Sequence, residues 1–158
     1  MTARVALALA ALLLTGPAAL AQTALKPSES IWKPAPTPPG GVAWAVLESA
    51  KEDPTAAKSG AVKPLYPPAV KSLAGKRVKI NGYMLPLGKG ANQSHFVLLA
   101  YPPDCPFHLN PGPQQFIEVK VSSAVPMNYD VRTIEGTLEL AGSNGAGVFY
   151  KISDGKEL

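Results

Sequence analysis

The sequence of 158 residues is poor in the residues that define several common classes of protein. Cys105 is the only cysteine, which excludes ordinary disulfide exchange within one molecule. No apolar run reaches the roughly 20 residues that a membrane-spanning helix needs. The 15 lysines and arginines exceed the 11 acidic residues only slightly, and they are scattered singly. The composition therefore gives no support for a nucleic-acid partner or an anionic membrane surface.

The first 21 residues have the three parts of a secretory signal peptide. Arg4 precedes an apolar stretch over residues 5–14, and small residues at Ala19 and Ala21 complete a cleavage site before Gln22. The apolar stretch is too short for a membrane anchor, and no cysteine stands at the cleavage point to carry a lipid. We expect a periplasmic or secreted protein that has no transmembrane anchor once the signal peptide is removed.

Residues 22–63 are predicted to form a proline-rich arm. Each proline fixes φ and removes a backbone donor, which excludes a long helix or a continuous strand over most of this stretch. Residues 42–51 lack proline, and Val42, Val46 and Leu47 give them the apolar face of a short docking helix. The rest of the arm is interpreted either as an extended segment lying on the domain or as a flexible spacer.

Residues 64–158 are predicted to form one β domain. Alternating or continuous apolar residues indicate five strands near residues 78–84, 96–100, 116–121, 132–140 and 148–152. Five short strands usually close into a barrel or pack as a sandwich, because closure removes exposed edges. A long first strand that a glycine bends fits an OB-like five-strand barrel best. The fold class is therefore mainly β.

The strongest candidate site lies on the loop that carries Cys105 and His108. Thiolate and imidazole are the ligands that Zn(II) and Cu(I) prefer, and the Cys-x-x-His spacing lets both side chains turn toward one point. Asp104 is a candidate third metal ligand, and Glu118, Tyr101 or a second copy of the chain are candidates to complete the site. The alternative is a buried cysteine that acts as a small hydrophobe, beside a histidine bonded to the loop backbone.

A second group of soft ligands is expected at the opposite end of the domain. If consecutive strands run up and down, His95 begins the strand that the Cys105 loop follows, and at 3.3 Å per residue the two ends lie about 16 Å apart. The same reasoning gathers Met84, His95 and Met127 at the end away from Cys105. Packing is the favoured interpretation of the two methionines.

Several motifs in the second half follow a known pattern. The matching residues are Leu73, Gly75, Lys76, Arg77, Val78, Ile80, Gly82, Tyr83 and residues 84–87, then residues 96–99 and Tyr101, then Cys105, His108, Pro111, Pro113, Gln114, Gln115 and residues 117–119, and finally Val131, Ile134, Gly136, Thr137 and Leu138. They resemble the exported bacterial proteins grouped as domain of unknown function 3299. The resemblance covers about residues 64–152. It implies no settled activity, and at most a link to metal homeostasis in the periplasm.

The sequence thus favours a periplasmic accessory protein that binds or handles a transition metal, either zinc or copper. The predicted ligands are Cys105, His108 and Asp104. The alternative is a non-catalytic interaction module that engages an envelope protein partner, with Cys105 in a structural role. A thiol-catalytic pair would need an oxyanion donor and an orienting group that the sequence does not reveal, so no catalytic residue is assigned. The oligomeric state is not predicted.

Overall fold

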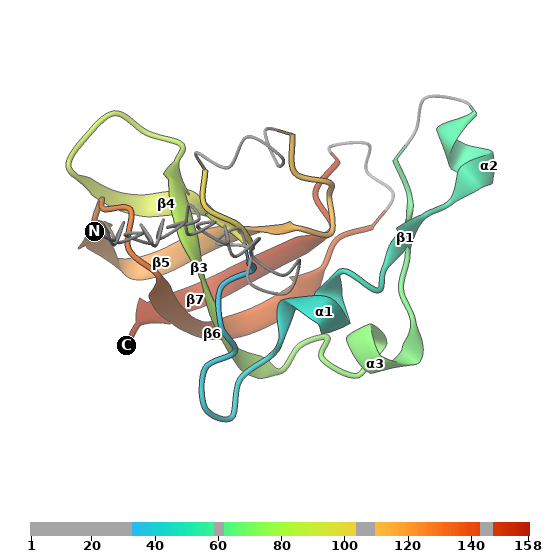
Figure 1. The fold of residues 1–158 in the computed structure, drawn as a ribbon, viewed down its shortest axis with the longest axis horizontal. Coiled ribbons are helices and arrows are strands. Elements are labelled where there is room, and N and C mark those ends of the chain that lie inside the picture. The colour runs from blue at the N-terminus through green and yellow to red at the C-terminus, as the bar shows by residue number, and fades with distance from the viewer. Residues whose placement is uncertain (1–32, 59–61, 104–109, 143–146) are drawn as a thin grey trace, which may run out of the picture. The chain divides into compact units, whose positions relative to one another are not determined.

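Five strands form a closed barrel in the computed structural model, which describes residues 33–58, 62–103, 110–142 and 147–158. The strands are β3 (Arg77–Pro86), β4 (Asn92–Leu99), β5 (Phe116–Pro126), β6 (Arg132–Leu140) and β7 (Tyr150–Glu157). They are hydrogen-bonded in the order β3-β4-β5-β7-β6, and β6 returns to pair with β3 (Figure 1). β5 and β7 are parallel, and all other neighbours are antiparallel. This mixed barrel, with its last strand inserted between the third and fourth, confirms the predicted OB-like fold.

Alternate side chains of each strand fill the barrel. On β6, Ile134 and Leu138 are buried and Glu139 is exposed, as the alternation predicts. The largest fully buried side chains of the barrel strands are Tyr150, Phe96, Ile80, Met84, Leu98, Ile117, Ile134, Leu138 and Ile152. Burial of this apolar surface is the main contribution to the stability of the barrel.

The first barrel strand, β3, changes its neighbour at Gly82. Its first half pairs with β6 as far as Gly82, which lies opposite Arg132. Its second half pairs with β4, beginning with Tyr83 opposite Leu99. A Cβ atom on Gly82 would lie 2.5 Å from Cγ of Leu98 and 2.8 Å from the carbonyl oxygen of Leu99. Only glycine therefore allows the close approach of β3 and β4 at this point.

The segment before the barrel packs on it through α1 (Trp44–Leu47). This helix is shorter than the predicted residues 42–51, because Val42 N donates to Lys79 O and Lys51 already pairs with Leu65. Trp44 Nε1 donates to Asn81 O at 2.7 Å, and the Tyr150 hydroxyl donates to Leu47 O at 2.6 Å. Trp44 and Leu47 thereby belong to the same hydrophobic core as the barrel.

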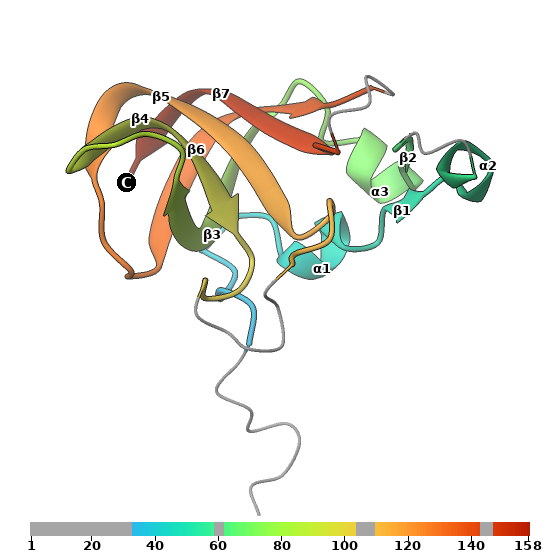
Figure 2. The same ribbon diagram turned by 90° about the horizontal axis from the view of Figure 1, so that it is seen from above.

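Short elements complete the described part of the chain. β1 (Lys51–Glu52) pairs with β2 (Pro64–Leu65), and α2 (Pro54–Ala57) lies between them in sequence. Figure 2 shows that α1, α3 (Pro68–Lys71) and this small sheet lie on one side of the barrel. Among the described residues, no helix is long and apolar enough to cross a membrane.

Candidate functional site

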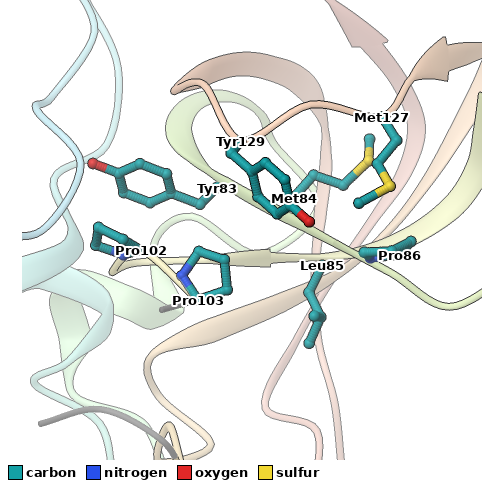
Figure 3. Close-up of a pocket in the computed structure, with 8 residues that line it drawn as sticks. All are labelled: Tyr83, Met84, Leu85, Pro86, Pro102, Pro103, Met127 and Tyr129. Carbon is teal, nitrogen blue, oxygen red and sulfur yellow. The ribbon is translucent and has the colours of Figure 1, made fainter. Parts of the chain in front are cut away.

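A groove of about 750 Å³ opens where the segment after β4 passes over β3. Its lining comes from three parts of the chain (Figure 3). The lining residues are Tyr83, Met84, Leu85 and Pro86 of β3, Pro102 and Pro103 after β4, and Met127 and Tyr129 between β5 and β6. Apolar side chains and two tyrosines thus dominate the lining, which is the character of many ligand-binding sites.

The groove exists because β3 extends beyond the start of β6. Pairing between β3 and β6 stops at Gly82, so the second half of β3 has a strand neighbour only in β4. The connection that carries Met127 and Tyr129 passes this half of β3 instead of a strand. A hollow remains between them, because a loop does not cover a strand as closely as a paired strand does.

The predicted metal ligands Asp104, Cys105 and His108 lie outside the described residues, and their arrangement stays a prediction. The chain leads to them through Pro102 and Pro103, which line the groove. Among the described residues, no three histidine, cysteine, aspartate or glutamate side chains gather into a metal site.

Two thioethers line the groove that Pro103 also lines. Met84 is 1% exposed, and Met127 packs half-buried against the core. Figure 3 shows both sulfur-bearing side chains at the end of the groove near Pro86, and the two other prolines near the tyrosines. Thioether sulfur is a soft donor that suits Cu(I), and it also fills apolar space well.

The prediction that Met84, His95 and Met127 gather is wrong for His95, which does not line the groove, and the position of Cys105 lies outside the described residues. Met84 and Met127 line the same groove as Pro103, two residues before Cys105. The reason is the offset of β4, whose last residue Leu99 lies opposite Tyr83 in the middle of β3. The segment that follows β4 therefore starts halfway along β3 rather than at its far end.

His95 belongs to a different surface, a charged cluster formed by His95, Glu118 and Lys151. Its side chain is 45% exposed, and Nε2 lies 2.8 Å from Oε1 of Glu118. The Nζ atom of Lys151 lies 3.0 Å from Oε2 of the same carboxylate. The hydrogen bond from Lys151, supported by that from His95, holds the pKa of the Glu118 carboxyl below its usual value. Glu118, a candidate to complete the cysteine site, is thus already bound by two basic side chains.

Buried Arg132 holds the loop that forms one wall of the groove. This residue is 4% exposed, and Nη2 donates to Pro126 O at 3.0 Å and to Oδ1 of Asn128 at 2.7 Å. Nη1 lies 3.0 Å from Oε1 of Glu157 on β7. Met127 N also donates to Ala91 O. The loop is therefore fixed at both ends.

Tyr129 stands on this fixed loop and is 71% exposed. Sequence reasoning missed both the role of Arg132 and the exposure of Tyr129. A signal for Arg132 was present, because it is in phase with Ile134 and Leu138 on the inward face of β6. An arginine at an inward position needs a buried partner, and that requirement points to an ordered loop beside the strand.

The fold and the groove define a small OB-like barrel with an apolar surface site, and sequence comparison places it in a family. The family described as "Protein of unknown function (DUF3299)" matches residues 38–153, so the chain belongs to it. The crystal structure of a DUF3299 family protein from Pseudomonas aeruginosa PAO1, at 2.45 Å resolution, is similar at 23% identity. The match covers 82% of this chain and 89% of that one, with a TM-score of 0.43. The search of curated proteins found no match.

Proposed function

We propose that the protein binds or hands on a transition-metal ion in the periplasm, with Cys105, His108 and Asp104 as ligands. The main support is that two thioethers, Met84 and Met127, line a groove that Pro103 also lines. In the sequence, Pro103 directly precedes the loop that carries Cys105. Zinc and copper both suit a thiolate and an imidazole. The additional sulfur donors favour Cu(I).

Covalent geometry limits how far the thiol lies from this groove. Consecutive Cα atoms are about 3.8 Å apart, so the Cα atom of Cys105 is within roughly 8 Å of that of Pro103. Pro103 lines the groove together with Met84 and Met127. A thiolate together with thioether sulfurs is the type of ligand set that Cu(I) selects.

Competition with a coloured Cu(I) chelator tests this proposal, using protein purified from the periplasm under anaerobic conditions. The parent is expected to take one Cu(I), and Cys105→Ser to abolish binding without a change in the fold. Because the thiol must lose its proton, the affinity should fall as the pH drops below neutral. A parent that removes neither Cu(I) nor, in a parallel titration, Zn(II) from its chelator would contradict the proposal.

The proposed compartment rests on the signal peptide and has a separate test. The intact mass of protein recovered from the periplasm should correspond to a chain that begins at Gln22. Retention of Met1 in that fraction would contradict the proposed export.

A second candidate is a non-catalytic module that engages an envelope protein. Exposed apolar side chains beside the groove favour it, since Leu85 is 41% and Tyr129 is 71% exposed. In that case Cys105 is structural, and its replacement by serine should destabilise the fold by about 1–3 kcal/mol, with no metal binding to lose.

A further inference from the structure

We propose that the groove binds a proline-rich segment of a partner protein. This inference does not depend on the proposed metal site. Three features carry it: the composition of the lining, the anchored loop that presents Tyr129, and the neighbouring contact that this chain already makes with its own proline-rich arm.

The lining matches the chemistry of a proline-rich ligand. The eight described residues that form it include two tyrosines, three prolines and two methionines, and no charged side chain. An ordinary extended peptide brings backbone N–H groups that need acceptors when they are buried. Proline has no N–H group, so a proline-rich segment enters such a groove at a smaller desolvation cost. Aromatic-lined grooves are the recurring docking sites of polyproline II segments.

The groove is already in place before a ligand binds. Arg132 holds the loop next to Tyr129 through Pro126 and Asn128, and Asn128 Oδ1 also accepts from Asp130 N at 3.2 Å. Tyr129 nevertheless remains the most exposed of the large apolar or aromatic side chains among the described residues. An exposed aromatic side chain on an anchored loop is typical of an interface anchor, because less backbone freedom is lost when a ligand covers it.

The proline-rich segment of this chain packs on the barrel close to the groove. Residues 33–39 contain four prolines, and Ala35 within them is 4% exposed. Ala35 N donates to Ala100 O at 2.8 Å. Ala100 lies two residues before Pro102, which lines the groove. The proposed site thus continues an existing interface between a proline-rich segment and the chain that follows β4.

Methionine-methyl NMR gives a direct test, because the chain has only Met1, Met84 and Met127. After loss of the signal peptide, both remaining methyl groups belong to the groove. The probe is an octaproline peptide, added in the presence of a metal chelator, and the control is a glycine–serine peptide of equal length. We expect octaproline to shift both methyl resonances in a saturable way and the control peptide to leave them unchanged.

Two variants test whether the shifts report binding in the groove. Tyr129→Ala should weaken octaproline binding about fivefold or more, since aromatic anchors carry much of the affinity of such sites. Leu65→Ala removes an exposed apolar side chain away from the groove, 46% exposed on β2, and should leave binding unchanged. The dispersion of the methyl and backbone NMR resonances of both variants shows whether the fold is retained.

Methyl resonances that do not shift with octaproline, or that shift equally with the glycine–serine peptide, would overturn the proposal. So would an unchanged octaproline affinity in a folded Tyr129→Ala variant. Methyl shifts that depend on protein concentration in the absence of peptide would also overturn it. The last result would show that a second copy of the chain occupies the groove. A response to a small apolar dye without a response to octaproline would assign the groove to small molecules instead.

Discussion

Two outer surfaces of the same barrel differ in how completely their strands are paired. Across β4, β5 and β7 every strand has a neighbour, and the outward side chains His95, Glu118 and Lys151 bind one another. Beside the second half of β3 a loop replaces a strand, and side chains of β3 line a groove. Paired strands bring neighbouring side chains close enough to satisfy each other. Where pairing ends early, a hollow remains for something else.

The largest expected difference in stability is between two arginines: buried Arg132, which holds the groove wall, and half-exposed Arg77, which lies outside the groove. Arg132 is buried and contacts Glu157, Pro126 and Asn128, so Arg132→Ala should lower the free energy of unfolding by about 3 kcal/mol. Nη2 of Arg77 lies 3.6 Å from Oε2 of Glu135, and the arginine side chain is 52% exposed. Arg77→Ala should therefore lower the free energy of unfolding by under about 1 kcal/mol. Urea unfolding measures both, and equal losses would show that the groove wall is not held by Arg132.

The charged cluster should contribute a small, pH-dependent amount of stability. Glu118→Gln should cost under about 1 kcal/mol at pH 7, as is usual for ion pairs near the surface. The pKa of Glu118 is lowered in the folded protein, so its contribution is present above the unfolded value of about 4.3 and disappears as the pH falls through the lower native pKa.

Urea unfolding at neutral and acid pH checks the expected direction. The parent and Glu118→Gln should differ at pH 7 and converge at a pH below the native pKa of the carboxyl. A difference that grows on acidification would mean that Glu118 is stabilised in its protonated form, contrary to its contacts with Lys151 and His95.

Replacing Met127 should change the free energy of unfolding least, but it should clearly lower the affinity for Cu(I). Met127→Leu keeps the volume of the side chain and should cost under about 1 kcal/mol. It removes one thioether, so Cu(I) affinity should fall roughly tenfold if that sulfur is a ligand. His95→Ala, in the charged cluster, should leave Cu(I) affinity unchanged. Equal loss in the two variants, measured by chelator competition, would remove the distinction between the surfaces.

Local patterns predicted the barrel but not the extent of its strands. The alternation over residues 132–140 gave β6 correctly, because one face of that strand is buried throughout. β5 continues to Pro126 through residues without such a pattern, because Asn92 and Gln93 of β4 pair with its last two residues. β7 reaches Glu157 for the same reason, since Glu157 pairs with Ile134. Tertiary pairing extends a strand where its own sequence is neutral.

The groove was not predictable from such patterns. It depends on the offset that places Leu99 opposite Tyr83, and on the early end of the pairing between β3 and β6. Both are properties of the register between distant strands. Sequence reasoning did group Met84 with Met127, but it added His95 to them and placed the chain after β4 at the far end of β3. The error arose because that reasoning assumed strands aligned end to end.

The most direct measurement is methionine-methyl NMR of the exported protein during addition of Cu(I), with the imidazole resonances of His95 followed in parallel. If the metal binds beside the groove, the Met84 and Met127 methyl resonances should shift with one equivalent of Cu(I), and those of His95 should not. The Cys105→Ser variant should abolish these shifts. Cu(I)-dependent changes at His95 with unmoved methionine resonances would contradict the assignment of ligand binding to the incompletely paired side of the barrel.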